Sequence, residues 1–208
     1  MLIQDLGWDA YFEALWREIP PDGSVPARVV SQHRGLWRLA GDFEECWGEP
    51  SGKLRKDAEA GGDWPAVGDW VSAERRTGQA NLVVQHVLAR RSRFVRKIPG
   101  KQVTEQVIVA NIDVVLVVAA LDGDFNVRRI ERYMAQCWES GARPAIVLNK
   151  ADACREPGEL LAHIEAVAMG APVFLLSAKN GDGVEALAGS FLKGQTIVLL
   201  GSSGVGKS

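Results

Sequence analysis

The feature that most constrains this chain is an eight-residue pattern at 201–208 that directly follows an apolar run at 196–200. The eight residues read Gly-Ser-Ser-Gly-Val-Gly-Lys-Ser, a full match to G-x-x-x-x-G-K-[ST]. Glycines let the backbone wrap so closely that successive N–H groups converge on one anion. We therefore expect a phosphate-binding loop made of Gly201, Ser202, Ser203, Gly204, Val205, Gly206, Lys207 and Ser208.

The last two residues of this loop carry its specific chemistry. In such a loop the Lys207 ammonium reaches the β- and γ-phosphates, and the Ser208 hydroxyl binds Mg²⁺. The pattern alone does not choose between ATP and GTP, so the neighbouring motifs must decide.

A second motif, Asn149-Lys150-Ala151-Asp152, follows another apolar run at 145–148. The Asp152 carboxylate can accept hydrogen bonds from the N1–H and 2-amino groups of guanine, whereas adenine has neither donor and would leave the carboxylate unpaired. Asn149 would hold the loop, and the stem of Lys150 would cover the base. This pattern favours guanine, although the same four residues also occur as the cap of a helix.

A third motif, Ser177-Ala178-Lys179, follows the apolar run at 173–176. We expect the backbone N–H of Ala178 to meet the O6 atom of guanine. The tripeptide is weak evidence alone and gains its value from its position after a strand.

Apolar runs of strand length alternate with helical patterns through residues 112–208. Runs at 113–120, 145–148, 173–176 and 196–200 read as buried strands of a mostly parallel sheet, whose ligands collect at the carboxyl ends of the strands. In ordinary small GTPases the phosphate loop precedes the other two motifs, and here it follows them. We therefore predict a circularly permuted P-loop GTPase domain, incomplete at its C-terminus because the chain ends within the loop pattern.

The first half of the chain has a different texture. Residues 1–22 read as an N-terminal helical segment, and short β-prone runs separated by Gly- and Pro-bearing turns fill 23–97, which indicates an OB-like β-barrel. The polar stretch 49–62 is expected to be a long loop, and 98–111 is expected to be a connector. The predicted fold is thus all-β followed by α/β.

Charge is distributed unevenly along the chain. Residues 1–74 carry 7 basic and 14 acidic side chains, 75–104 carry 8 basic and none acidic, and 105–208 carry 9 and 12. Such a cationic block is either a solvated surface or a contact to a phosphate backbone. The residues we consider for RNA contact are Arg90, Arg91, Arg93, Arg96, Lys97 and Lys101.

Cysteine use and hydropathy favour a cytoplasmic protein. Cys46, Cys137 and Cys154 form neither a disulfide framework nor a C-x-x-C pair, so this chain offers no zinc site of that kind. Its apolar runs fall short of the ~20 residues that span a bilayer. The first ten residues hold Asp5 and Asp9 but no Lys or Arg, the wrong charge for a signal peptide.

Together these motifs resemble the ribosome small-subunit-dependent GTPase family, circularly permuted assembly factors of bacteria. The resemblance extends to 65–71 (Pro-Ala-Val-Gly-Asp-Trp-Val), 90–97 (Arg-Arg-Ser-Arg-Phe-Val-Arg-Lys) and 105–113. It implies GTP hydrolysis with Mg²⁺, an OB-fold that contacts ribosomal RNA, and a role in late maturation of the small subunit. A monomer without membrane contact is expected.

The chain departs from this family after the phosphate loop, where the family carries its switches and a zinc-binding domain. The catalytic residue is therefore unknown, Zn²⁺ is expected only in that further domain, and residues 1–208 alone are expected to bind guanine nucleotide weakly and to hydrolyse it negligibly. Two alternatives stay open: a P-loop ATPase or kinase, and an RNA-binding module with a non-hydrolysing nucleotide domain.

Overall fold

The computed structural model describes residues 2–19, 23–98, 104–123 and 125–207, without the side chains of 97, 98, 104, 157 and 159. The chain divides into two compact units, Met1–Asn111 and Ile112–Ser208, and each is described here by itself.

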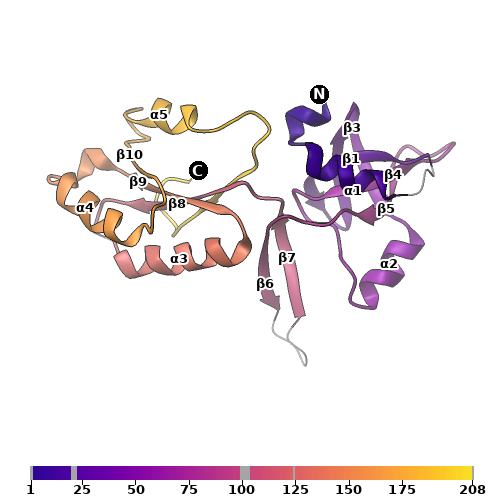
Figure 1. The fold of residues 1–208 in the computed structure, drawn as a ribbon, viewed down its shortest axis with the longest axis horizontal. Coiled ribbons are helices and arrows are strands. Elements are labelled where there is room, and N and C mark those ends of the chain that lie inside the picture. The colour runs from indigo at the N-terminus through magenta and orange to yellow at the C-terminus, as the bar shows by residue number, and fades with distance from the viewer. Residues whose placement is uncertain (1, 20–22, 99–103, 124, 208) are drawn as a thin grey trace. The chain divides into compact units, whose positions relative to one another are not determined.

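The first unit is built on a closed five-stranded barrel (Figure 1). Its strands are β1 (Val25–His33), β2 (Leu36–Gly41), β3 (Phe43–Pro50), β4 (Trp70–Arg75) and β5 (Leu82–Val87). The order around the barrel is β1-β2-β3-β5-β4, with β1 pairing with β4 to close it and β3 running parallel to β5. This is the OB-like barrel that the short β-prone runs predict.

Two apolar clusters hold this unit together. Inside the barrel, Trp37, Leu39 and Val84 are fully buried. Outside it, η1 (Ile3–Leu6), α1 (Ala10–Arg17) and the short segment between them place Ile3, Trp8 and Phe12 against Trp70. The Asp9 side chain caps α1 by accepting from the N–H groups of Tyr11 and Phe12. Trp37 and Trp70 have no exposed surface, so both serve the core of this unit.

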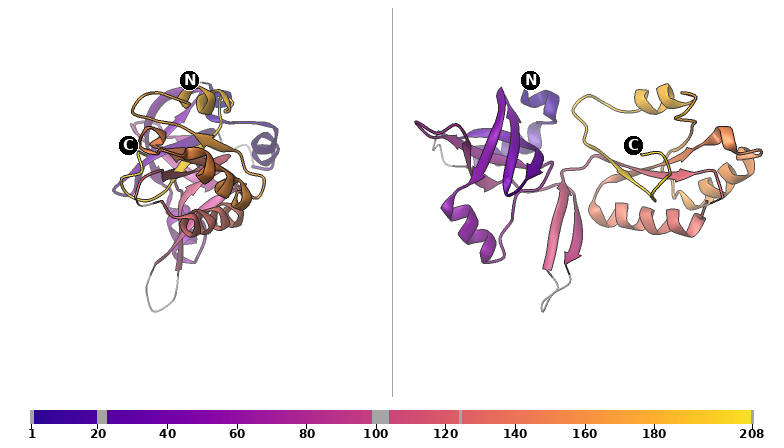
Figure 2. Two further views of the ribbon diagram at one scale, coloured as in Figure 1. Left: turned by 90° about the vertical axis from the view of Figure 1, so that its left-hand side faces the viewer. Right: turned by 180° about the vertical axis from the view of Figure 1, so that it is seen from behind.

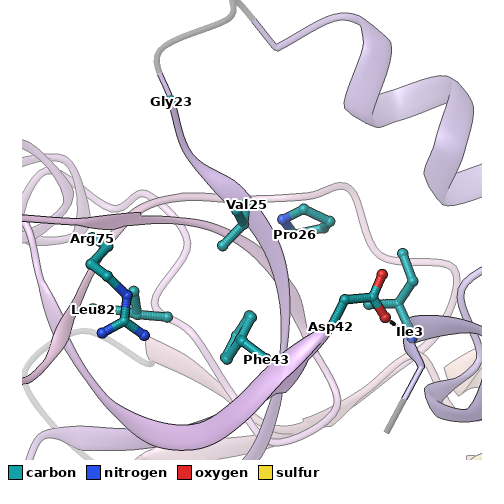
Figure 3. Close-up of a pocket in the computed structure, with 8 residues that line it drawn as sticks. All are labelled: Ile3, Gly23, Val25, Pro26, Asp42, Phe43, Arg75 and Leu82. Carbon is teal, nitrogen blue, oxygen red and sulfur yellow. Dashed lines mark hydrogen bonds between the residues drawn. The ribbon is translucent and has the colours of Figure 1, made fainter.

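One end of the barrel is hollowed by a cavity of about 380 Å³. Figure 3 shows Phe43 and Leu82 among its apolar lining, with Arg75 and Asp42 contributing opposite charges. The Asp42 carboxylate accepts a 2.7 Å hydrogen bond from the backbone N–H of Ile3. This bond fastens η1 to the turn between β2 and β3.

The stretch 49–62 is not the long loop that its polarity suggests. It contains α2 (Gly52–Glu59), which begins after Ser51, whose hydroxyl accepts a 3.0 Å hydrogen bond from the N–H of Leu54. Leu54 is buried in the barrel cluster. One cap and one buried leucine therefore suffice to order a helix whose other side chains are mostly polar.

Residues 98–111, expected as a connector, include a strand. β6 (Arg93–Ile98) pairs antiparallel with β7 (Thr104–Ala110) in a separate two-stranded sheet (Figure 2). The backbone passes Gly68 closely at this point, because a Cβ there would collide with the carbonyl of Ala110, and Gly68 has φ +92°.

The second unit contains a four-stranded parallel sheet in the order β10-β9-β8-β11. Its strands are β8 (Val114–Ala120), β9 (Arg143–Asn149), β10 (Val173–Leu175) and β11 (Ile197–Leu200), joined by α3 (Val127–Ser140), η2 (Ala151–Ala153), α4 (Pro157–Val167) and α5 (Val184–Gly189). The alternation of strand and helix is the one predicted from the apolar runs.

Alternate residues of the central strand β8 feed two cores. Leu116 and Val118 belong to the cluster on which Leu187 of α5 packs. Val115 and Val117 are fully buried on the other face, and in Figure 1 the helix α3 lies along the face of the sheet opposite α5. Across the described ranges, none of the helices is long and apolar enough to traverse a bilayer.

Candidate functional site

The three sequence motifs lie at the carboxyl ends of neighbouring parallel strands in the second unit. Asn149 ends β9, the residues from Ser177 onward follow β10, and Gly201 directly follows β11. Because β9 pairs with β10 and with β8, and β8 with β11, all three loops emerge at one edge of the sheet.

The phosphate loop is described through Lys207, and Ser208 lies outside the described residues. Gly204 and Gly206 have φ +80° and +93°, which β-carbon-bearing residues rarely adopt, and a Cβ on Gly206 would collide with the side-chain amide of Asn149. The Lys207 ammonium donates to the carbonyl oxygens of Gly201 (2.9 Å) and Ser202 (2.5 Å). The glycines of the pattern are thus required by backbone shape and by close packing.

Asn149 joins all three motifs. Its Nδ2 donates to the carbonyl oxygen of Val205 in the phosphate loop at 2.9 Å. Its Oδ1 accepts from the backbone N–H of Ala178 at 3.0 Å. The side chain is buried, and a buried amide that is satisfied on both its donor and acceptor sides fixes the relative position of the two loops. The predicted contact between the Ala178 N–H and guanine O6 stays a prediction, and it requires this N–H to leave or share its bond to Asn149.

Asp152 is the exposed acid of the site. Its Oδ1 accepts a 2.7 Å hydrogen bond from the hydroxyl of Ser177, which is itself buried. This bond lowers the pKa of Asp152, with smaller contributions from the positive charges of Lys179 and Lys150. The carboxylate is therefore ionised at neutral pH and presented to solvent as an acceptor.

Lys150 stands in the left-handed backbone region, at φ +65°. The Lys150 ammonium forms an ion pair with the Asp122 carboxylate, with 2.8 Å between N and O. Asp122 lies two residues after the end of β8, so this pair holds Lys150 across the site. The carbonyl oxygen of Asp122 also accepts a 3.0 Å hydrogen bond from the N–H of Phe125.

Three features of this edge are those that the predicted nucleotide site requires. The loop leaves no room for a Cβ at Gly206, it carries an ammonium, and a carboxylate is exposed on an adjoining loop. The described part of the chain contains no group of three His, Cys, Asp or Glu side chains placed to hold a metal. The Mg²⁺ role of Ser208 stays a prediction.

This chain is similar to known proteins in sequence and in fold. The sequence model of a family described as RsgA GTPase matches residues 87–208. The chain belongs to the RsgA GTPase family.

Relatives and solved structures agree with that assignment. The small ribosomal subunit biogenesis GTPase RsgA of Syntrophotalea carbinolica is 39% identical over the whole chain, and that of Opitutus terrae is also 39% identical. The structure of YjeQ from Thermotoga maritima is 25% identical with a TM-score of 0.72, over 89% of this chain and 63% of that one. YloQ, whose title describes a circularly permuted GTPase, is 20% identical with a TM-score of 0.67, covers 91% and 64%, and supports the fold.

The chain spans 58% of the length of the Syntrophotalea relative and 59% of the Opitutus relative. The circularly permuted fold that the order of the motifs predicts is confirmed by the fold of YloQ.

The basic residues proposed for RNA contact separate into two groups in this RsgA-family chain. The Arg90 side chain is only 6% exposed and donates to Asp69 (2.7 Å), Asp63 (2.5 Å) and the carbonyl of Trp64 (2.9 Å). Burial raises the pKa of Asp69, against the lowering effect of Arg90, which stays charged beside it. The Arg90 guanidinium is held by residues of the first unit, so the prediction that this arginine contacts RNA is corrected.

Arg91 also serves the first unit. Its guanidinium pairs with Asp9 and lies 4.6 Å from the ring centre of Tyr11 and 4.4 Å from that of Phe12, which anchors α1. Arg93 and Arg96 are exposed on β6 and stay available for a phosphate backbone. The Lys97 side chain and the whole of Lys101 lie outside the described residues.

Sequence reasoning missed two residues of the second unit that contact the motifs. Asp122 holds Lys150, and Arg129 on α3 donates to Ser202 in the phosphate loop. A signal for the first was available, since Asp122 comes two residues after the end of β8, at the edge where the other motifs lie.

Proposed function

We propose that this protein binds guanine nucleotide with Mg²⁺ at the edge formed by β8–β11 and hydrolyses GTP in the service of small-subunit maturation. The observation that carries this proposal is the pair of hydrogen bonds made by Asn149, which holds the phosphate loop and the Ala178 loop on either side of one buried amide.

Each part of the nucleotide has a group to receive it. The converging N–H groups of the phosphate loop and the Lys207 ammonium would hold the β- and γ-phosphates. Mg²⁺, bound with the nucleotide, would neutralise charge between those phosphates, with Ser208 as its proposed protein ligand. Lys150 and Lys179 would flank the base beside Ala178.

Base preference comes from Asp152. The Asp152 carboxylate is ionised at neutral pH, and the Ser177 hydroxyl lowers its pKa further, so guanine can satisfy it with two N–H donors, whereas adenine would bury it unpaired. Leaving a buried acceptor unsatisfied costs about 1–3 kcal/mol, more when it is charged. GTP is therefore favoured over ATP at this site.

The partner we propose is the small ribosomal subunit, late in its maturation. The relatives that match this chain are named small ribosomal subunit biogenesis GTPases. The barrel, with the exposed Arg93 and Arg96 on β6, supplies a cationic strip for ribosomal RNA, and Lys97 and Lys101 are proposed to extend it. A cytoplasmic monomer is the proposed state.

Nucleotide competition tests the binding step. A fluorescent GDP analogue bound to the protein should be displaced by GTP and GDP at far lower concentrations than by ATP. Equal displacement by ATP would overturn the role of Asp152 and favour a P-loop ATPase or kinase. No binding of any nucleotide would overturn the proposed site.

Sedimentation with isolated small subunits tests the partner. We expect association to depend on whether GDP or a non-hydrolysable GTP analogue is present, and Lys207→Ala should remove that dependence. If association of the wild-type protein is the same with GDP, with the GTP analogue and without nucleotide, the nucleotide domain is a passive scaffold and the RNA-binding alternative holds. A dependence that persists in Lys207→Ala would overturn the proposed role of Lys207.

A further inference from the structure

The first turn of α3 has an unusual charge. The helix begins after Asn126, whose side chain accepts from the N–H of Arg129, and its first turn carries Arg128 and Arg129 but no acidic residue. A helix N-terminus already bears partial positive charge, so a cationic side chain there is unfavourable unless it forms another favourable interaction.

Arg129 forms such an interaction with the phosphate loop. Its Nη1 donates a 2.6 Å hydrogen bond to the Ser202 hydroxyl, in a partly buried setting and across 73 residues of sequence. Ser202 directly follows Gly201 in the phosphate loop. The neighbouring Arg128 is exposed on the same turn.

Ser202 is also the point where a second cation meets the loop. The Lys207 ammonium lies 2.5 Å from the Ser202 carbonyl oxygen, while Arg129 holds the hydroxyl of the same residue. Lys207 would exchange this carbonyl for phosphate oxygens when nucleotide binds. Arg129 can keep its bond to Ser202 throughout, because it approaches from the side of α3.

The space between α3 and the loop is too small to hold any part of the nucleotide. The cavity there measures about 20 Å³ and is lined by Arg129, Tyr133, Ser202 and Val205 among others. That volume holds a single water at most. Arg129 therefore acts through Ser202.

We propose that Arg129 is a positioning residue for the phosphate loop, which holds Ser202 so that the loop N–H groups converge on the β-phosphate before nucleotide arrives. This inference rests on the proposed guanine-nucleotide function. A preset loop avoids the cost of ordering it at the moment of binding.

The first measurement needs no nucleotide. Hydrogen exchange of the amides at 203–207 should speed up in Arg129→Ala and stay at the wild-type rate in Arg128→Ala, which removes the same charge from the same turn. Unchanged exchange in Arg129→Ala would overturn the positioning role, whether or not the protein binds GDP.

The second measurement compares ligands with and without a β-phosphate. We expect Arg129→Ala to weaken GDP binding about tenfold, the size of one hydrogen bond to a charged donor, and to leave GMP binding nearly unchanged. Arg129→Lys should restore part of the loss. Equal losses for GDP and GMP, or an equal loss in Arg128→Ala, would contradict the proposal.

A double-mutant cycle tests whether the two residues act together. Ser202→Ala should weaken GDP binding as Arg129→Ala does, and combining them should add little, because both remove one bond. Additive losses would overturn the link. Failure of the wild-type protein to bind GDP would instead overturn the proposed function, and the exchange result would still decide the role of Arg129.

Discussion

The side-chain Nδ2 of Asn149 lies 2.9 Å from the carbonyl oxygen of Val205, which ties the end of β9 to a loop 56 residues further along the chain. The same amide accepts from Ala178 through Oδ1. An amide is suited to this position because it can donate on one side and accept on the other.

Replacing Asn149 with Asp should separate these two bonds. A carboxylate of the same shape keeps the acceptor toward Ala178 but cannot donate to Val205, so two acceptors would face each other. We expect GDP affinity to fall at least tenfold and the free energy of unfolding of the second unit to fall by about 1–3 kcal/mol. Titration with a fluorescent GDP analogue and thermal unfolding measure both effects. Asn149→Ala, which loses both bonds, should bind GDP more weakly still. An Asn149→Asp variant that binds GDP like the wild-type protein would contradict this account.

The sequence allowed the site to be predicted because its motifs depend on backbone shape and local order. Gly206 must be glycine because its φ is +93° and because a Cβ there would collide with the Asn149 amide. The residue type in the sequence therefore indicates the shape of the loop. The support from Arg129 was not predictable, since a partner 73 residues away is set by the packing of α3 on the sheet.

The same reasoning explains the errors in the first unit. Polarity suggested a loop at 49–62, but Leu54 alone carries the burial that orders α2. Arg90 was considered for RNA contact on charge, whereas its buried partner Asp69 decides its role. Composition gives the charge of a segment, and only the fold shows which charges are already paired.

Asp152→Asn should change which base the site prefers. An Asn amide can donate to the 2-oxo group of xanthine, where Asp152 would repel it, and it loses the charged acceptor that guanine needs. We expect GDP binding to weaken about 100-fold, or ~2.7 kcal/mol, and XDP binding to improve. Competition between the two nucleotides measures the switch. Glu156→Gln removes an exposed charge from the same unit and should leave the preference unchanged; an Asp152→Asn variant that still prefers GDP would contradict the role of Asp152.

Ser177→Ala should shift the pH dependence of nucleotide binding. The Ser177 hydroxyl lowers the pKa of Asp152, so the carboxylate stays ionised as pH falls, and affinity is lost only when pH passes through that lowered pKa. Without the hydroxyl the pKa returns toward the ordinary carboxyl value, and the loss should begin at higher pH. GDP affinity measured from neutral to acid pH, with circular dichroism to confirm folding, gives the two profiles. Ser190→Ala, at the residue that follows α5, is the control, and superimposable profiles for Ser177→Ala and wild type would refute the assignment.

Arg90→Met should destabilise the barrel far more than Arg96→Ala. Removing Arg90 leaves the Asp69 carboxylate, which has no exposed surface, without its cation, at a cost of about 3–5 kcal/mol. Arg96 is exposed on β6, so its loss should cost less than about 0.5 kcal/mol. Urea unfolding followed by tryptophan fluorescence reports this unit, because Trp138 is the only tryptophan beyond Asn111. Similar unfolding midpoints in the two variants would contradict the structural role of Arg90.

Alkylation of Cys137 should report nucleotide binding in the second unit. Burial raises the pKa of Cys137 to about 11, and the side chain has no exposed surface. Only the thiolate reacts, so at pH 8 on the order of one thiol in a thousand is reactive, and attack requires opening of the unit. Because GDP stabilises only the closed form, GDP at 100 times its Kd should slow Cys137 alkylation about 100-fold.

Cys46 in the barrel unit provides the internal control for that measurement. Its alkylation should not respond to GDP, whereas protection of Cys137 should disappear in Lys207→Ala. Mass spectrometry of peptides from one reaction follows both thiols together. Equal protection of Cys46 and Cys137 would mean that nucleotide stabilises the barrel as well, and no protection of Cys137 would mean that GDP does not bind the folded GTPase unit.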